Sequence, residues 1–119
     1  MLIDSHTHLN FQAYDDDLQE VIDRCQSEKM ALINVGAAFD TSQKAVQLAQ
    51  ENNNFYASIG LHPIHVMDEE FKIADYKNLI DNNPGKIAAI GETGLDYFHN
   101  QDIQVKQKEI FLQHIELAK

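Results

Sequence analysis

Residues 2–9 read LIDSHTHL, and this short stretch decides which kind of α/β fold the sequence predicts. It opens with an apolar run, which predicts a short strand, and continues into polar residues without a single glycine. A doubly wound sheet favours a glycine-rich first turn, such as G-x-G-x-x-G or a P-loop, at this point. The stretch instead favours a (β/α) barrel, in which polar residues collect where the strands end.

The remainder of the chain alternates apolar strands with amphipathic helices. After the first strand at 2–5, continuous apolar runs predict strands at 31–35, 55–59 and 87–90. The first predicted helix carries Leu18–Cys25, and the second begins at about Thr41. The third is capped by Asp68 and closed by residues 83–85. The fourth runs from Ile103 to the end. This order predicts a parallel sheet covered by helices.

The number of units sets the expected extent of the fold. A complete barrel of the TIM type has eight βα units in about 250 residues, whereas residues 1–119 hold four predicted strands. We therefore expect one partial domain, the N-terminal half of a (β/α) barrel. Two open strand edges and an apolar face would then favour self-association of the chain.

The composition excludes several classes of protein. Hydrophobic residues make up 44% of the chain and charged residues 24%, as in globular domains with a packed core. The formal net charge of -10 argues against a protein that binds nucleic acid through basic charge alone. Bound metal ions, however, reverse the local field.

The remaining compositional signals concern location. The single cysteine, Cys25, excludes an internal disulfide framework. No apolar run approaches the ~20 residues of a membrane-spanning helix, and the chain does not open like a signal peptide. The expected location is cytoplasmic.

His6 and His8 form the sharpest local motif. In an extended segment, alternate residues point to the same side, so the two imidazoles should lie a few ångströms apart. Such a pair at a strand end can chelate Zn²⁺, Mn²⁺ or a similar ion. The alternative is a pair of exposed or structurally satisfied histidines.

Glu92 is the second candidate, because it follows the fourth predicted strand between Gly91 and Gly94. A carboxylate there can bridge two metal ions or act as a base toward metal-bound water. The alternative is a loop carboxylate in a turn that the glycines make.

Three further residues are predicted to contact a ligand. His62 follows the third strand, and the alternative is that it is only a turn histidine before Pro63. Asp96 and Tyr97 follow Glu92 in the same loop, where the aromatic ring could stack on a base or close the barrel mouth. The other histidines carry structural interpretations. We expect His65 and His99 to be solvated and His114 to pack within the last helix.

Three motifs in order resemble the TatD family of metal-dependent hydrolases, which are (β/α) barrels related to amidohydrolases and act as deoxyribonucleases. The motifs are DSHTHL at residues 4–9, GLHP at residues 60–63 and IGETGLDY at residues 90–97, and the last helix is also similar. The resemblance extends over essentially the whole chain, and the three motifs together are specific.

The resemblance implies a role for particular positions. His6 and His8 match the pair that ligates a first metal, Glu92 matches a carboxylate that bridges two metals, and His62 matches a histidine near the substrate. The expected cofactors are two divalent ions, with Mg²⁺, Mn²⁺ and Zn²⁺ not distinguished by the sequence. The family takes two further histidines and a catalytic aspartate from later strands, which lie beyond this sequence.

The expected activity is hydrolysis of DNA phosphodiester bonds by a metal-activated water, with single-stranded DNA or a chain end as substrate. One alternative is hydrolysis of a small amide, lactone or ester on the same fold, because a fold does not fix its substrate. Another is a non-catalytic half-barrel or interaction module, since part of the family's site lies beyond this sequence.

Overall fold

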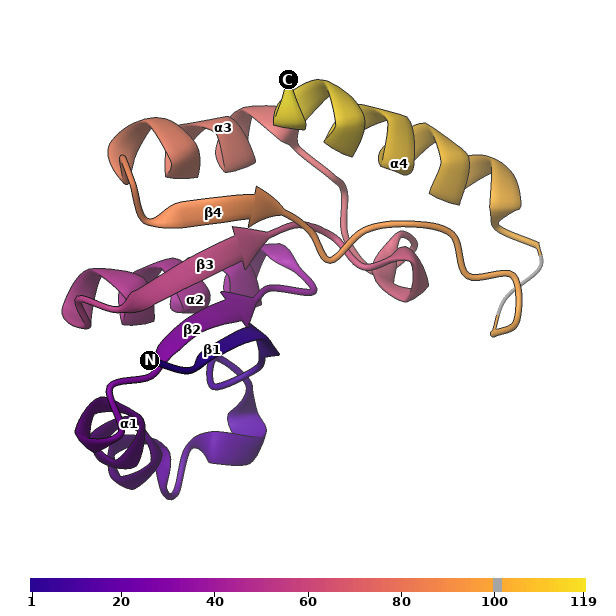
Figure 1. Cartoon of the computed structure of the whole chain (residues 1–119). Helices are drawn as coiled ribbons and strands as arrows, with labels where there is room; N and C mark the ends of the chain where they lie inside the picture. Colours follow the sequence, from indigo (N-terminus) through magenta and orange to yellow (C-terminus); the bar gives the residue numbers. More distant parts are fainter. Residues whose placement is uncertain (100–101) are drawn as a thin grey trace.

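The computed structural model, which describes residues 1–99 and 102–119, contains one four-stranded parallel sheet in the order β1-β2-β3-β4 (Figure 1). A helix follows each strand, as the sequence predicts. The elements are β1 (Ile3–Thr7), η1 (Gln12–Tyr14), α1 (Leu18–Ser27), β2 (Ala31–Val35), α2 (Phe39–Glu51), β3 (Phe55–Ile59), η2 (Pro63–His65), α3 (Ile73–Asn82), β4 (Ile87–Ile90) and α4 (Gln104–Ala118).

The register of the sheet is regular in its centre and shifted toward both edges. Strands β2 and β3 pair without interruption from Leu32↔Phe55 onward. In contrast, the register between β1 and β2 shifts between Asp4 and Thr7. Three steps along β1 therefore match only two along β2, from Leu32 to Asn34. This irregularity lies in the segment that carries His6.

The core lies between the sheet and the helices in two adjoining clusters. One cluster surrounds Ala57 and Ile59 of β3 and includes side chains from α2, α3 and α4. The other surrounds Leu32 and Phe55 and includes side chains from α1 and α2. Alternate residues of the central strands thus face the helices, which leaves the opposite face for other contacts.

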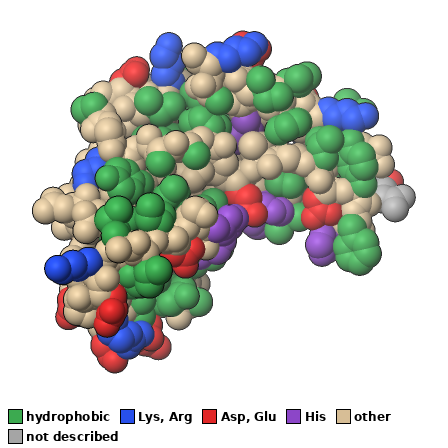
Figure 2. Space-filling model, in the orientation of Figure 1, with side chains coloured by type: hydrophobic (Ala, Val, Ile, Leu, Met, Phe, Trp, Pro, Cys, Tyr) green, Lys and Arg blue, Asp and Glu red, His purple; other side chains and the backbone are tan. Residues whose placement is uncertain are grey.

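Both outer edges of the sheet are open among the described residues. Within the described part of the chain, β1 pairs only with β2 and β4 pairs only with β3. Leu2 and Ile3, beside the β1 edge, are 66% and 62% exposed. The Cα radius of gyration is 14.7 Å, compared with about 13.5 Å for a compact domain of this length. The curved, open shape is visible in Figures 1 and 2.

Helix starts differ from the sequence expectation. The predicted cap Asp68 is wrong, because α3 begins at Ile73 after Lys72, and Asp68 instead pairs with the His65 ring. Helix α2 begins at Phe39, two residues before the predicted start. The cap could not be read from the acidic residue alone, because the Asp68 carboxylate is engaged by the His65 ring in the preceding turn. None of the described helices is long and apolar enough to cross a membrane.

Candidate metal centre

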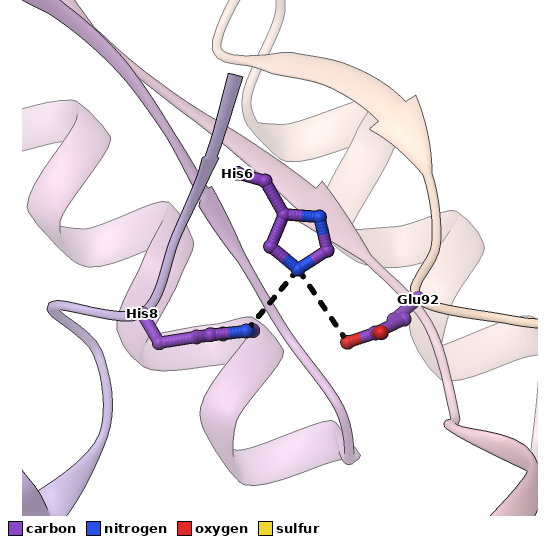
Figure 3. A group of neighbouring side chains, drawn as sticks. All are labelled: His6, His8 and Glu92. Carbon is purple, nitrogen blue, oxygen red and sulfur yellow. Dashed lines mark hydrogen bonds and ion pairs between the residues drawn. The ribbon is translucent and has the colours of Figure 1, made fainter. Parts of the chain in front are cut away.

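The candidate residues meet at the carboxyl edge of the sheet. His6 lies in β1, His8 lies just after it, Glu92 follows β4 and His62 follows β3. Because all four strands are parallel, their carboxyl ends share one edge, and residues far apart in sequence become neighbours. Figure 3 shows His6 in β1, His8 just after it and Glu92 in the segment after β4 pointing toward one another.

Three of these side chains converge closely enough to hold one ion. The Nε2 atoms of His6 and His8 are 3.2 Å apart. His6 Nε2 also lies 3.8 Å from Glu92 Oε2. One ligand atom from each of the three residues lies within 4.8 Å of the others. The geometry matches the expectation that His6 and His8 share one side of their strand.

The orientation of His8 fits a metal ligand. Its Nδ1 lies 2.9 Å from the carbonyl oxygen of Val35, which can only accept a hydrogen bond. Nδ1 therefore carries the proton, and neutral His8 presents an unprotonated Nε2 to the centre of the site. A backbone carbonyl on the far ring nitrogen is a common arrangement for metal-binding histidines. Two imidazoles and a carboxylate form a donor set suited to Zn²⁺ or Mn²⁺.

The backbone around Glu92 is fixed by contacts across three strands. The Glu92 N–H donates to the carbonyl of Gly36 at 3.0 Å, and the Ser58 hydroxyl donates to the carbonyl of Gly91 at 2.8 Å. A Cβ on Gly60 would stand 2.9 Å from the Gly91 carbonyl carbon. The close approach of these two backbones thus requires glycine at position 60.

His62 faces the other oxygen of the same carboxylate. Its Nδ1 accepts a hydrogen bond from the Ile64 N–H at 3.1 Å, so the neutral ring carries its proton on Nε2. That Nε2 lies 3.8 Å from Glu92 Oε1. Burial lowers the pKa of His62, while the Glu92 carboxylate acts in the opposite direction. His62 is therefore a neutral N–H donor beside Glu92.

Asp96 and Tyr97 lie farther along the loop that carries Glu92. The Asp96 carboxylate accepts hydrogen bonds from the Phe98 and His99 N–H groups and contacts the His99 ring at 2.6 Å. Hydrogen bonds from His99 hold the pKa of Asp96 below its usual range. Tyr97 is half-buried. Asp96 thus shapes the loop, and contact of either residue with substrate stays a prediction.

The other histidines take the expected structural positions. His99 is exposed and His65 is half-exposed, and each pairs with a nearby aspartate. His114 is 1% exposed and lies in the core, where its Nε2 accepts a hydrogen bond from the Leu61 N–H at 2.9 Å. The prediction that His114 packs within the fold is confirmed.

Sequence reasoning missed the residues behind the histidine pair. Asn34 is fully buried in β2 and bonds to residues on both sides of His8. Asn10 donates to Val35 and Thr41 carbonyls. The signal that could have revealed Asn34 is an amide in the middle of the apolar strand ALINV, because a buried polar side chain needs a partner.

Known proteins are similar to this chain along its whole length. It is 41% identical to a Bacillus subtilis protein named "Uncharacterized metal-dependent hydrolase YabD", covering 100% of this chain and 47% of the relative. It is 28% identical to a mouse protein named "Putative deoxyribonuclease TATDN3", covering 99% of this chain and 45% of the relative. The chain therefore spans about half the length of these curated relatives.

A solved structure supports the barrel architecture. The crystal structure of YjjV, a TatD homologue from Escherichia coli K12, matches with a TM-score of 0.85 and 24% identity, covering 99% of this chain and 46% of that chain. The four-stranded parallel sheet thus has the TIM-barrel type of fold over about half of the reference chain. A family model described as "TatD related DNase" matches residues 3–119. The chain belongs to the TatD family.

Proposed function

We propose that this chain supplies the N-terminal half of a TatD-type barrel and part of the site of a metal-dependent hydrolase that cleaves DNA phosphodiester bonds. The observation that carries the proposal is the convergence of His6, His8 and Glu92 at the carboxyl edge of the sheet. The hydrolase class is supported by the family match, and the DNA substrate by the family description and by the name of the mouse relative.

In this proposal, His6, His8 and Glu92 hold a divalent ion. The ion would supply Lewis-acid activation of the phosphodiester and of the attacking water. His8 is prepared for this role, since the Val35 carbonyl keeps its proton on Nδ1. Glu92 presents one oxygen to His6 and the other to His62, so its carboxylate lies between these two histidines.

His62 would act on Glu92 and on the substrate rather than as a ligand. With Nδ1 engaged by the Ile64 N–H, its remaining polar atom is an Nε2–H donor directed at the Glu92 side of the site. A neutral donor there can orient the carboxylate or bind a phosphate oxygen.

Charge explains why a DNA substrate would require the metal. The chain has 19 acidic residues and 9 basic ones. In Figure 2 the histidines on the hollow side of the molecule lie beside acidic side chains, and Lys and Arg lie toward the periphery. Neutral histidines and carboxylates do not attract a polyanion, whereas bound divalent ions reverse the local field.

The first test measures metal binding by the 119-residue chain. The protein is loaded with Mn²⁺ or Zn²⁺, and bound metal per chain is determined by elemental mass spectrometry for the wild type, His6→Ala and Glu116→Gln. We expect about one weakly bound ion, lost in His6→Ala and retained in Glu116→Gln, which removes an exposed carboxylate near the end of α4. About two ions per chain would indicate that a second copy supplies the other ligands. No specific metal would contradict the proposal.

The second test addresses the substrate. The chain is joined to the C-terminal half of the Bacillus subtilis relative, and hydrolysis of a labelled single-stranded oligonucleotide is compared with hydrolysis of small amide and lactone substrates. We expect metal-dependent DNA cleavage that Glu92→Ala abolishes while the circular dichroism spectrum is kept. Wild-type-like cleavage by Glu92→Ala, or cleavage of the amide or lactone alone, would contradict the DNase proposal.

A further inference from the structure

We infer that Asn34 is a positioning residue for the proposed metal centre, and that its buried amide oxygen holds the strand end carrying His6 and His8 from the helix side of the sheet. The inference rests on the proposed function for its consequence, metal affinity. Its structural basis is independent of any bound ion, because it consists of hydrogen bonds within this chain.

The amide oxygen of Asn34 binds both neighbours of His8. Its Oδ1 accepts a hydrogen bond from the Thr7 hydroxyl at 2.7 Å and from the Leu9 N–H at 3.2 Å. Asn34 is 0% exposed and Leu9 is 4% exposed, so both bonds are shielded from water. A buried bond of this kind is costly to leave unmade, and it therefore fixes the backbone on either side of His8.

Strand alternation explains how a residue on one face controls ligands on the other. The Thr7 side chain faces Asn34, and residues 6 and 8 lie one position away on either side. In an extended segment such neighbours point to the opposite face. Fixing Thr7 and Leu9 toward the helices thus directs His6 and His8 into the site.

The position of Asn34 in the register gives this contact its importance. The pairing of β1 with β2 shifts between Asp4 and Thr7, and it resumes at Thr7↔Asn34. A strand can slip where its ladder is irregular, and a slip of one residue exchanges the two faces. The Asn34 side chain pins the register at the point where the ladder resumes.

The next residue of β2 completes the arrangement. The Val35 carbonyl accepts hydrogen bonds from His8 Nδ1 at 2.9 Å and from the Asn10 side-chain amide at 3.0 Å. If residues 7–9 move away from Asn34, the distance from His8 to Val35 changes with them. The Asn34 contact and the His8 tautomer are consequently coupled.

The two ends of the Asn34 amide are not equivalent, which makes the inference testable. Among the described residues, Asn34 Nδ2 is buried without a hydrogen-bond partner, whereas Oδ1 has two. Asn34→Asp therefore keeps an oxygen that can accept from Thr7 and Leu9, and it loses only the Nδ2 group, which has no partner among the described residues. Asn34→Leu keeps a similar volume and removes the acceptor.

The experiment compares Asn34→Leu, Asn34→Asp, Thr7→Val and the control Asn52→Leu in the 119-residue chain. Asn52 is a buried asparagine that bonds to Leu48 and Gln26 at the end of α2, remote from the site. Two quantities are measured: the ¹⁵N chemical shifts that report the His8 tautomer in metal-free protein, and the Kd for Zn²⁺ and Co²⁺. Thermal unfolding verifies that each variant folds.

In Asn34→Leu we expect His8 to become a mixture of tautomers and metal affinity to fall about 10-fold or more, as for other groups that orient metal ligands. Thr7→Val, which keeps the hydrogen bond from the Leu9 N–H to Asn34, should lose less metal affinity. Asn34→Asp should keep the wild-type tautomer and bind metal within about threefold of wild type or more tightly, although burying a charge lowers its Tm. Asn52→Leu should lower Tm without changing either quantity.

An unchanged His8 tautomer in a folded Asn34→Leu variant would overturn the inference, whatever the metal affinity. If Asn34→Leu does not fold, the tautomer in Thr7→Val decides in the same way. Failure of the wild type to bind metal would instead overturn the proposed function. The tautomer measurement would still decide the role of Asn34, because it needs no metal.

Discussion

At the scale of single residues, the candidate site depends on which ring nitrogen carries the proton. His8 donates from Nδ1 to a backbone carbonyl, and His62 accepts at Nδ1 from a backbone N–H. The two rings therefore present opposite chemistry at Nε2, a lone pair in His8 and a proton in His62. The same residue type can thus serve as a metal ligand in one position and as a hydrogen-bond donor in the other.

Glu92 is the charged member of the site, and its removal should weaken metal binding most directly. Glu92→Gln keeps the shape of the side chain but removes the negative charge, so we expect the Kd for Mn²⁺ to rise by roughly 100-fold. Isothermal titration calorimetry measures this change. Glu116→Gln, which removes one exposed carboxylate from α4, is the control. Equal affinities for Glu92→Gln and the wild type would exclude Glu92 as a ligand.

At the scale of elements, two contacts decide how the helices dock on the sheet. Helix α4 is attached through His114, whose Nδ1 donates to the Ile110 carbonyl and whose Nε2 accepts from Leu61 just after β3. The ring also stacks on Phe71 at a centroid distance of 4.1 Å. Helix α2 approaches the end of β2 so closely that Gly36 lies against Ser42.

His114 should make the stability of the fold depend on pH. Burial lowers the pKa of His114 below its ordinary value of 6.5, so below that pH the unfolded chain binds a proton that the folded chain resists. The contribution is present above pH 6.5 and is lost as the pH falls through the folded-state pKa. The free energy of unfolding, measured by denaturation at about pH 7.5 and about pH 5.5, should fall less between these two pH values in His114→Gln than in the wild type. An equal loss would contradict this role.

The junction of β2 and α2 should not tolerate a side chain at position 36. A Cβ on Gly36 would stand 2.6 Å from the Ser42 Cα and 2.8 Å from its backbone nitrogen, and backbone atoms cannot yield without moving the helix. We expect Gly36→Ala to lower the free energy of unfolding by about 3 kcal/mol, measured by urea denaturation. Gly91→Ala is the comparison, because its Cβ would meet the Ser58 hydroxyl at 3.3 Å. Similar losses of stability in the two variants would show that the close contact between position 36 and Ser42 is not the cause of the destabilisation.

At the scale of the whole molecule, the open edges of the sheet are the feature that should most affect association with other chains. Strands β1 and β4 each pair on one side only within residues 1–99 and 102–119, and apolar residues lie close to both edges. Helix α4 adds exposed apolar side chains at Val105, Leu112 and Ile115. Unpaired edges and apolar patches of this kind favour association with another chain.

The 119-residue chain should therefore self-associate. We expect a dimer or larger species by size-exclusion chromatography with light scattering. A charge at the β1 edge or on the exposed face of α4, in Ile3→Lys or Leu112→Lys, should shift the population toward monomer, since edge charges oppose pairing. Lys77→Glu, which changes a charge on α3, is the control. Elution of the wild type as a stable monomer with low binding of a hydrophobic dye would contradict the prediction.

Local patterns were enough for much of the fold and for part of the site. The strands at 31–35, 55–59 and 87–90 occur at the predicted positions, because continuous apolar runs report burial between helices. His6 and His8 were paired correctly, since alternation along one strand is a local property. The predicted helix starts are less accurate, because a carboxylate such as Asp68 can bind a neighbouring ring instead of a helix N-terminus.

The sequence by itself determined the parallel α/β architecture and the residue types of the site, through periodicities that extend over a few residues. Only the tertiary structure decided that Glu92 reaches His6, that His62 faces Glu92 and that Asn34 holds Thr7. These contacts join different strands, and the shifts in register between strands depend on how the whole sheet packs. Local patterns do not encode such distances, because they arise from the sum of many long-range contacts.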